Sequence, residues 1–131
     1  MIKTLNGLRP HILSLVRVMG GALFLGHGTQ KIAGFPATDR ITEMFTLGWF
    51  AGVFELICGA LLVVGFQTRW AAFVASGVMA FAYFLAHAPR DFYPVNNGGD
   101  AAVLYCFLFF YLVFAGPGPW SVDALLRRDR G

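Results

Sequence analysis

Charged residues are scarce in this chain, and their scarcity excludes an ordinary soluble protein. They make up 13% of its 131 residues, about half of the roughly 25% that soluble domains carry. Hydrophobic residues make up 57% and the mean hydropathy is +0.64, which is typical of an integral membrane protein. The net charge of +3 comes largely from loops and the C-terminal tail, so we expect no nucleic-acid partner.

Cysteine and the common catalytic motifs are also scarce or absent. The two cysteines, Cys58 and Cys106, form no C-x-x-C motif and lie at different predicted depths, so we expect no disulfide between them. The sequence contains no phosphate-binding loop, dinucleotide fingerprint or hydrolase triad. His27, His87 and Asp100 are a weak metal-ligand set because the two histidines fall on different helices, and we predict no metal site. A redox role would therefore need a bound or borrowed electron carrier.

Long apolar stretches take up most of the chain. A helix needs roughly 20 apolar residues to cross the hydrocarbon core of a membrane. The stretches predict an all-α protein, an integral membrane four-helix bundle that forms one domain over residues 1–131. The predicted spans are residues 11–32, 46–66, 69–88 and 100–115. Ser121 is a predicted N-cap for a short amphipathic C-terminal helix at the membrane interface.

The distribution of lysine and arginine predicts the orientation, because basic residues concentrate on the cytoplasmic side. The predicted side of the two termini carries more basic residues, namely Lys3, Arg9, Arg69, Arg127, Arg128 and Arg130. The other side carries Lys31, Arg40 and Arg90. We therefore expect a multi-pass protein of the bacterial inner membrane with both termini in the cytoplasm. The first apolar stretch is too long for a cleavable signal peptide and is expected to remain as a span.

Glu55 is the most unusual residue of the second span, since no other charge lies between Glu43 and Arg69. A carboxylate at the centre of a membrane helix costs roughly 3 kcal/mol unless it is paired. Arg17 is the other charge deep in an apolar span, and the rise of about 1.5 Å per residue puts both at similar depth. We predict an Arg17–Glu55 ion pair, which either fastens helices together or belongs to a ligand or proton site.

Small and polar residues recur at three- and four-residue steps on three of the spans. Because lipid cannot satisfy polar groups, these stripes are expected to face the interior. The stripes are Arg17, Gly20, Gly21, Phe24, His27, Gly28 and Lys31; Gly48, Gly52, Glu55 and Gly59; and Ser76, Ala80, Tyr83 and His87. On the fourth span, we interpret the aromatic face of Leu104, Phe107, Tyr111 and Phe114 as a packing surface.

Several polar residues fall near the outer ends of the spans. They are His27, Lys31, His87, Asn97 and Asp100. Their common depth predicts a polar pocket that opens outward above Glu55. Each also has a structural interpretation, because a lysine near a helix end can extend to the interface and a histidine can make a local helix-end contact.

Four motifs, in order along the chain, resemble those of the DoxX family. They are His27-Gly28-Thr29-Gln30-Lys31 with Gly34-Phe35; Glu55 to Gly59 with Gly65-Phe66-Gln67-Thr68-Arg69; Asn97-Gly98-Gly99-Asp100; and Gly116-Pro117-Gly118 to Asp123. The family usually has glutamate at the position of Asp100. The resemblance implies a small four-helix membrane protein with these residues at shared positions: His27, Lys31, Glu55, Arg69, Asn97 and Asp100.

The resemblance also implies a function. DoxX-family proteins include membrane subunits of a thiosulfate:quinone oxidoreductase, and others are linked to oxidative-stress complexes and catabolic dioxygenases. Distant eukaryotic relatives look like cargo receptors or assembly chaperones. The implied function is an accessory, redox-linked membrane subunit whose polar pocket binds a quinone- or lipid-like molecule.

Two other functions stay open at this point. One is a non-catalytic scaffold or chaperone for another membrane protein, in which the buried ion pair is structural. The other is a small transporter that oligomerises through Gly48 and Gly52. The expected partners are membrane lipid and either a partner protein or a second copy of the chain.

Overall fold

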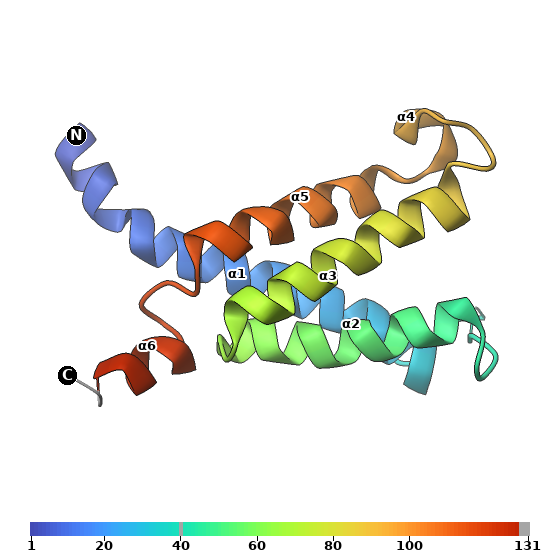
Figure 1. Cartoon of the computed structure of the whole chain (residues 1–131), viewed down its shortest axis with the longest axis horizontal. Helices are drawn as coiled ribbons and strands as arrows, with labels where there is room; N and C mark the ends of the chain where they lie inside the picture. Colours follow the sequence, from blue (N-terminus) through green and yellow to red (C-terminus); the bar gives the residue numbers. More distant parts are fainter. Residues whose placement is uncertain (40, 129–131) are drawn as a thin grey trace.

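The computed structural model describes residues 1–39 and 41–128, and this part of the chain is helical and contains no strand. The all-α prediction is confirmed for it. Two residues of the charge count, Arg40 and Arg130, lie outside the described residues. The helices drawn in Figure 1 are α1 (Ile2–Ala33), α2 (Leu47–Val64), α3 (Thr68–Ala82), the π-helical η1 (Tyr83–His87), α4 (Pro94–Asn97), α5 (Asp100–Ala115) and α6 (Val122–Arg128).

Three helical segments are long and apolar enough to cross a membrane: α1, α2 and Thr68–His87, which joins α3 to η1. These segments confirm a membrane protein with several apolar helices. The helix α5 is also apolar but has 16 residues, about 24 Å at the α-helical rise, against a hydrocarbon core of about 30 Å. The helix α1 begins before the first predicted span, since it continues through Pro10 to Ile2.

The closest packing in the structure joins α1 to α2, which run antiparallel. A Cβ atom added at Gly28 would lie 2.6 Å from the backbone nitrogen of Leu56. One added at Gly59 would lie 2.7 Å from the Cα of Leu25. Only glycine permits so close an approach of two helix backbones, so the predicted small-residue stripes do face each other. Gly52 also faces α1 and is covered by it.

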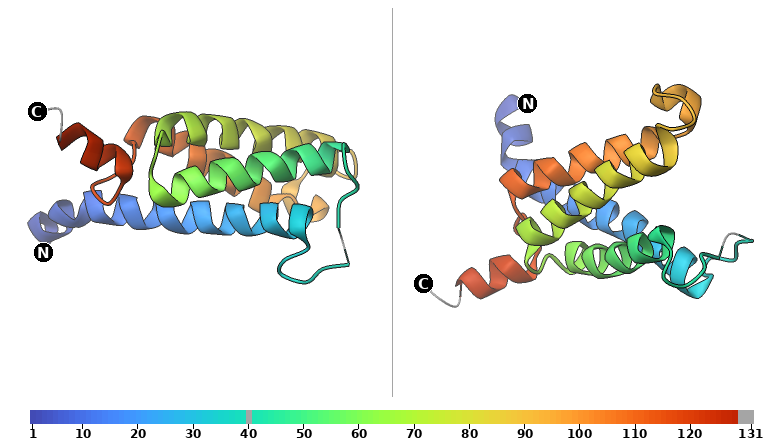
Figure 2. Two further views of the ribbon diagram at one scale, coloured as in Figure 1. Left: turned by 90° about the horizontal axis from the view of Figure 1, so that it is seen from below. Right: turned by 45° about the vertical axis from the view of Figure 1, so that its right-hand side comes forward.

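The helices α3 and α5 form a second antiparallel pair. The Ser76 hydroxyl of α3 donates a hydrogen bond to the Cys106 carbonyl of α5 at 2.9 Å. At one end of the pair, the guanidinium of Arg69 donates to the Phe114 carbonyl at 2.8 Å. The left view of Figure 2 shows the long helices side by side, with α4 at the end opposite the start of α1 and α6.

The interior face of α5 is not the aromatic face singled out in the sequence. The side chains of that aromatic face are exposed: Leu104, Phe107, Tyr111 and Phe114. Ala102, Phe109 and Leu112 are buried instead. Because α5 is apolar on every side, the spacing of its apolar residues cannot indicate which side meets α3.

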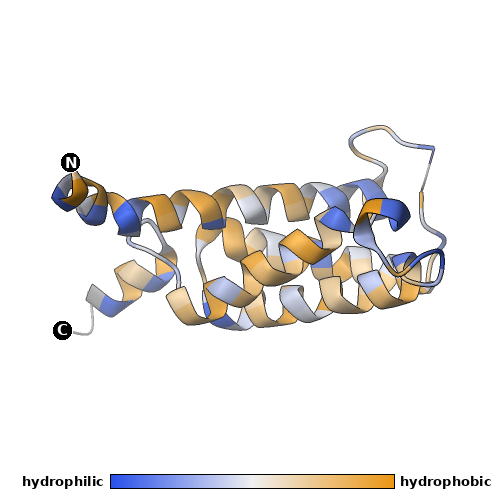
Figure 3. Ribbon diagram, turned by 90° about the horizontal axis from the view of Figure 1, so that it is seen from above, coloured by the Kyte–Doolittle hydropathy of each residue, from blue (hydrophilic) through white to orange (hydrophobic). Residues whose placement is uncertain are grey.

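The start of α1 and the helix α6 lie at the same end of the bundle, and α6 is held there by specific contacts (Figures 1 and 2). The predicted N-cap is confirmed, since the Ser121 hydroxyl accepts a hydrogen bond from the Ala124 N–H at 3.1 Å. The Asp123 carboxylate accepts bonds from the N–H groups of Gln67 and Thr68, both at 2.9 Å. Figure 3 shows hydrophobic residues along the helices and hydrophilic ones mostly near their ends and in the loops.

The glycine contact generates a first prediction. Gly28→Ala is expected to lower the free energy of unfolding by about 1–3 kcal/mol, because the added methyl group overlaps the α2 backbone. Unfolding in detergent micelles, followed by circular dichroism, measures the change. Gly26→Ala is the matched control on the same helix, since nothing lies within 4 Å of its added Cβ. Equal losses in the two variants would contradict a backbone contact at Gly28.

Candidate functional site

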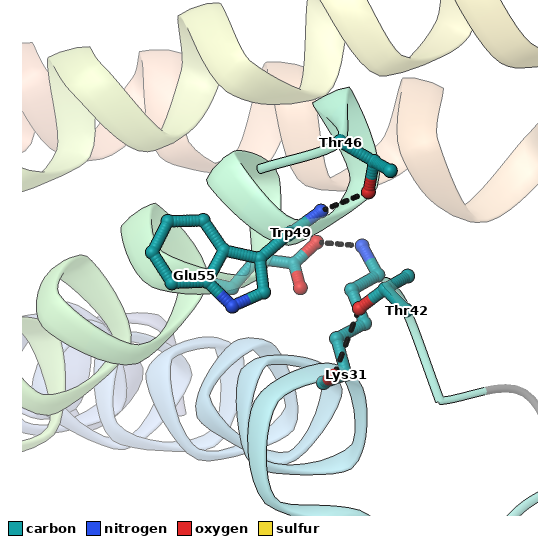
Figure 4. A network of polar contacts seen from close by, with 5 residues as sticks. All are labelled: Lys31, Thr42, Thr46, Trp49 and Glu55. Carbon is teal, nitrogen blue, oxygen red and sulfur yellow. Dashed lines mark hydrogen bonds and ion pairs between the residues drawn. The ribbon is translucent and has the colours of Figure 1, made fainter. Parts of the chain in front are cut away.

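Glu55 is paired with Lys31 across the contact between α1 and α2. The Lys31 Nζ atom lies 2.6 Å from Glu55 Oε1, and Figure 4 shows the two groups pointing toward each other. The side chain of Glu55 is 2% exposed and that of Lys31 is 30% exposed. Thr42 holds the end of α1 by donating to the Lys31 carbonyl at 2.8 Å, and Thr46 caps α2.

The predicted Arg17–Glu55 ion pair is wrong. Arg17 is fully buried, but its guanidinium donates to backbone carbonyls. These are Pro117 at 2.8 Å, Val63 at 2.9 Å, Leu62 and Trp120. Two of the four belong to the last turn of α2, where helix carbonyls carry partial negative charge. Arg17 therefore fastens α1 to the end of α2 and to the loop before α6.

The register between α1 and α2 explains the error. Val63 lies eight residues after Glu55, which is about 12 Å farther along α2. The predicted depths were counted from the expected helix ends, which do not determine how far one helix slides along the other. The glycine contacts do determine it: Gly28 lies against Glu55 and the residue after it, so Lys31 reaches the carboxylate.

A cavity of about 240 Å³ lies beside the ion pair. Its polar lining comes from α1, α2, η1 and α5, and consists of His27, Lys31, Glu55, His87 and Tyr105. Phe24, Met79 and three alanines supply much of its apolar lining. The Oε2 atom of Glu55 is buried and has no hydrogen-bond partner in the part of the chain that the structure describes. The carboxylate therefore has one oxygen engaged by Lys31 and one able to accept a hydrogen bond from a ligand.

The two histidines line the cavity in different ways. His27 is exposed at its rim, and its ring meets that of Tyr105 edge-on, with centroids 6.1 Å apart. His87 is half-buried, and its Nδ1 lies 3.1 Å from the Asn97 carbonyl. Because a carbonyl only accepts hydrogen bonds, this contact places the proton of the neutral ring on Nδ1 and leaves Nε2 as an acceptor.

Asn97 and Asp100 do not line the cavity. The buried Asn97 amide donates to the Asp91 carbonyl at 2.7 Å, and its Oδ1 accepts from the Gly99 N–H at 2.7 Å. Asn97 thus shapes the loop that supports His87. Asp100 is exposed in the first turn of α5, where a negative charge stabilises the helix. Within residues 1–39 and 41–128, no group of three or more His, Cys, Asp and Glu side chains is arranged to hold a metal.

Tyr105 is the polar lining residue that the site prediction missed. It lies on the interior side of α5, where its ring contacts those of Phe24 and Phe109 with centroids 6.1 Å and 5.6 Å apart. The uniform apolarity of α5 hides this face in the sequence. Once the structure shows that Ala102 and Phe109 are buried, the steps of three and four residues place Tyr105 on the same face, but the sequence alone carries no signal for that choice.

Comparison with known proteins identifies the family. The DoxX family model matches residues 12–88, which include Arg17, both cavity histidines, Lys31 and Glu55. The chain belongs to the DoxX family. The match ends before α5, so Tyr105 and Asp100 lie outside the matched region.

Relatives of this DoxX-family chain include proteins of three bacteria. A Haemophilus influenzae protein named as uncharacterised is 37% identical over 93% of this chain and 96% of its own length. An uncharacterised membrane protein of Mycobacterium tuberculosis is 26% identical over 91% of this chain and 83% of its own. The Escherichia coli inner membrane protein YqjF is 25% identical over 87% of this chain and 91% of its own length. No solved structure matches.

The revised pairing generates a second prediction. A double-mutant cycle with Lys31→Met and Glu55→Gln is expected to give a coupling free energy of about 0.5–3 kcal/mol, because the two side chains are in direct contact. The cycle with Arg17→Met and Glu55→Gln should be additive to within about 0.5 kcal/mol. Free energies of unfolding in micelles measure both. A larger coupling for Arg17 than for Lys31 would contradict the observed register.

Proposed function

We propose that this protein binds a quinone- or lipid-like molecule whose polar headgroup occupies the cavity beside Glu55. The main support for this proposal is the buried Oε2 atom of Glu55, which has no hydrogen-bond partner in the described chain. Glu55 lines the cavity together with Lys31 and His27. A buried acceptor of this kind favours a ligand that donates a hydrogen bond. A hydroxylated headgroup, such as that of a quinol, meets this requirement.

The size of the cavity supports a headgroup rather than a whole ligand. Its volume of about 240 Å³ lies below the roughly 300–1,000 Å³ typical of sites for drug-sized molecules. A ring or a small polar group fits such a space, and an attached apolar chain would have to leave it.

An apolar groove supports a route for that chain. It has a volume of about 510 Å³ and runs between α1 and α5, with Met19 and Leu23 on one side and Leu108 on the other. It shares Ala101 and Tyr105 with the cavity. The main packing partners are α2 for α1 and α3 for α5, which leaves the junction of α1 and α5 the more open side.

The chemistry of the lining supports binding and proton exchange. Lys31 and His27 can donate hydrogen bonds to a carbonyl, and Glu55 can accept one from a hydroxyl and take its proton. Electrons for a redox reaction would come from a partner protein, so we infer an accessory membrane subunit. The hydrogen-bonding groups of His27, Lys31, Glu55 and Tyr105 in the cavity lining support this proposal.

We also infer that the whole chain forms one domain of the bacterial inner membrane, with α5 as a fourth span. The antiparallel pairing of α5 with α3 along most of its length supports this inference. The excess of Lys and Arg at the end that holds the start of α1 and α6 supports a cytoplasmic location for this end.

Ligand binding is tested with the purified protein in mild detergent. Adding a short-chain quinol at about a hundred times its dissociation constant is expected to stabilise the protein by about 2.7 kcal/mol, seen as a higher melting temperature. Glu55→Gln and Tyr105→Phe should reduce this stabilisation. Asp100→Asn is the control, because Asp100 is exposed and does not line the cavity. Absence of stabilisation, together with no co-purified quinone or lipid, would rule the function out.

The same experiment separates the ligand site from a scaffold in which the ion pair only joins helices. Replacing both charges, Lys31→Met with Glu55→Met, is expected to restore the stability that a single replacement loses. In a ligand site this double variant stays insensitive to the quinol. In a scaffold it recovers partner capture as well as stability, and the wild type never responds to the quinol.

Topology is tested separately with reporters. A fusion at the C-terminus should be active only with a cytoplasmic reporter. Asn96→Cys, at an exposed position of the short helix α4, should react with a membrane-impermeant thiol reagent from outside the cell. Labelling of Asn96→Cys only after the membrane is broken would reverse the orientation.

A further inference from the structure

A second cavity lies at the opposite end of the protein, where three arginines from three helices meet. It has a volume of about 520 Å³ and is lined by Arg9 of α1, Arg69 of α3 and Arg127 of α6. The Pro117–Pro119 loop supplies backbone to its wall, and Tyr111 contributes a phenol ring. This end is far from the Glu55 cavity and shares no lining residue with it.

None of the three arginines forms an ion pair in the part of the chain that the structure describes, although Asp123 lines an adjoining cavity with Arg69 and Arg127. No carboxylate lines the cavity, and the described ion pair is Lys31–Glu55 at the other end. The nearby Asp123 uses both oxygens to accept bonds from the N–H groups that begin α3. Arg69 uses one nitrogen, Nη1, on the carbonyls that end α5, and Arg127 uses Nε on the Asp123 carbonyl. The remaining guanidinium N–H groups are available to an anion.

An apolar groove continues from this cavity. It has a volume of about 410 Å³, shares Arg9, Leu13 and Tyr111 with the cavity, and is otherwise lined by Leu5, Ile12 and Val16 of α1. No carboxylate lines it either. A basic cavity that opens into an apolar groove matches a molecule with an anionic head and a hydrocarbon chain.

We propose that the cavity formed by Arg9, Arg69 and Arg127 binds the phosphodiester headgroup of an anionic phospholipid, with one acyl chain in the adjoining groove. Arginine guanidinium groups pair with phosphate oxygens through two parallel hydrogen bonds. Basic pockets between membrane helices bind such headgroups. A free phosphate has the same headgroup chemistry, but only a lipid has a hydrocarbon chain that could fill the adjoining apolar groove. The proposal is independent of the ligand beside Glu55.

The experiment compares two lipids with identical acyl chains on the full-length protein in a neutral detergent. Native mass spectrometry with added phosphatidylglycerol or phosphatidylcholine is expected to show tighter binding of phosphatidylglycerol. Arg9→Gln and Arg127→Gln should each weaken the binding of phosphatidylglycerol about fivefold, because each basic residue contributes about 1 kcal/mol. Neither change should alter the binding of phosphatidylcholine. Arg9→Lys, which keeps the charge but loses the planar fork, should fall between Arg9→Gln and wild type.

Lys3→Gln is the matched control, because Lys3 is exposed at the N-terminal end of α1 and lines neither the cavity nor the groove. An equal loss in Lys3→Gln would reduce the effect to general surface attraction and overturn the site. Equal binding of the two lipids would overturn it as well. Displacement of phosphatidylglycerol by inorganic phosphate at the same concentration would show that the cavity takes a free phosphate, which also overturns the lipid assignment.

Discussion

The contact of the α1 and α2 backbones through glycines is the constraint on which the rest of the structure depends. In lipid, apolar side chains gain little by meeting each other, so close backbone packing holds helices together. A methyl group at Gly28 or Gly59 would lie within 3 Å of the opposite backbone, so the two helices have little freedom to slide. This register decides which charges meet, and it places Lys31 against Glu55 and Arg17 against the end of α2.

Arg17 and Glu55, the two buried charges of the long helices, differ in how fully their hydrogen-bonding groups are satisfied. This difference distinguishes a structural role for Arg17 from a binding role for Glu55. All four hydrogen bonds that Arg17 makes within the described chain go to backbone carbonyls, so its guanidinium joins α1 to α2 and to the loop before α6. Glu55 is only half satisfied, because Lys31 engages Oε1 and Oε2 has no partner in the described chain. A group left half satisfied in a cavity is the better candidate for binding.

The two cavities share one design in which a polar chamber opens onto an apolar groove. Beside Glu55 the chamber carries one carboxylate among possible hydrogen-bond donors, whereas at the opposite end it carries three arginines and no carboxylate. The charges therefore select different molecules, a hydroxylated headgroup at one end and a phosphodiester at the other. Both grooves run along α1, the helix whose exposed face carries many of the apolar residues that line them.

The sequence by itself determined the membrane class and, to within two residues, the bounds of α2, of the segment Thr68–His87 and of α5. It also determined the interior stripes of three helices and four of the five polar cavity residues. These follow from local properties, namely apolar length, spacing on a helix and the cost of a charge in lipid. Only the tertiary structure decided that Glu55 meets Lys31 rather than Arg17, that Tyr105 faces inward, and that Asn97 and Asp100 stay outside the cavity. Helix register and the choice of face on a uniformly apolar helix depend on contacts between segments, which composition and periodicity do not encode.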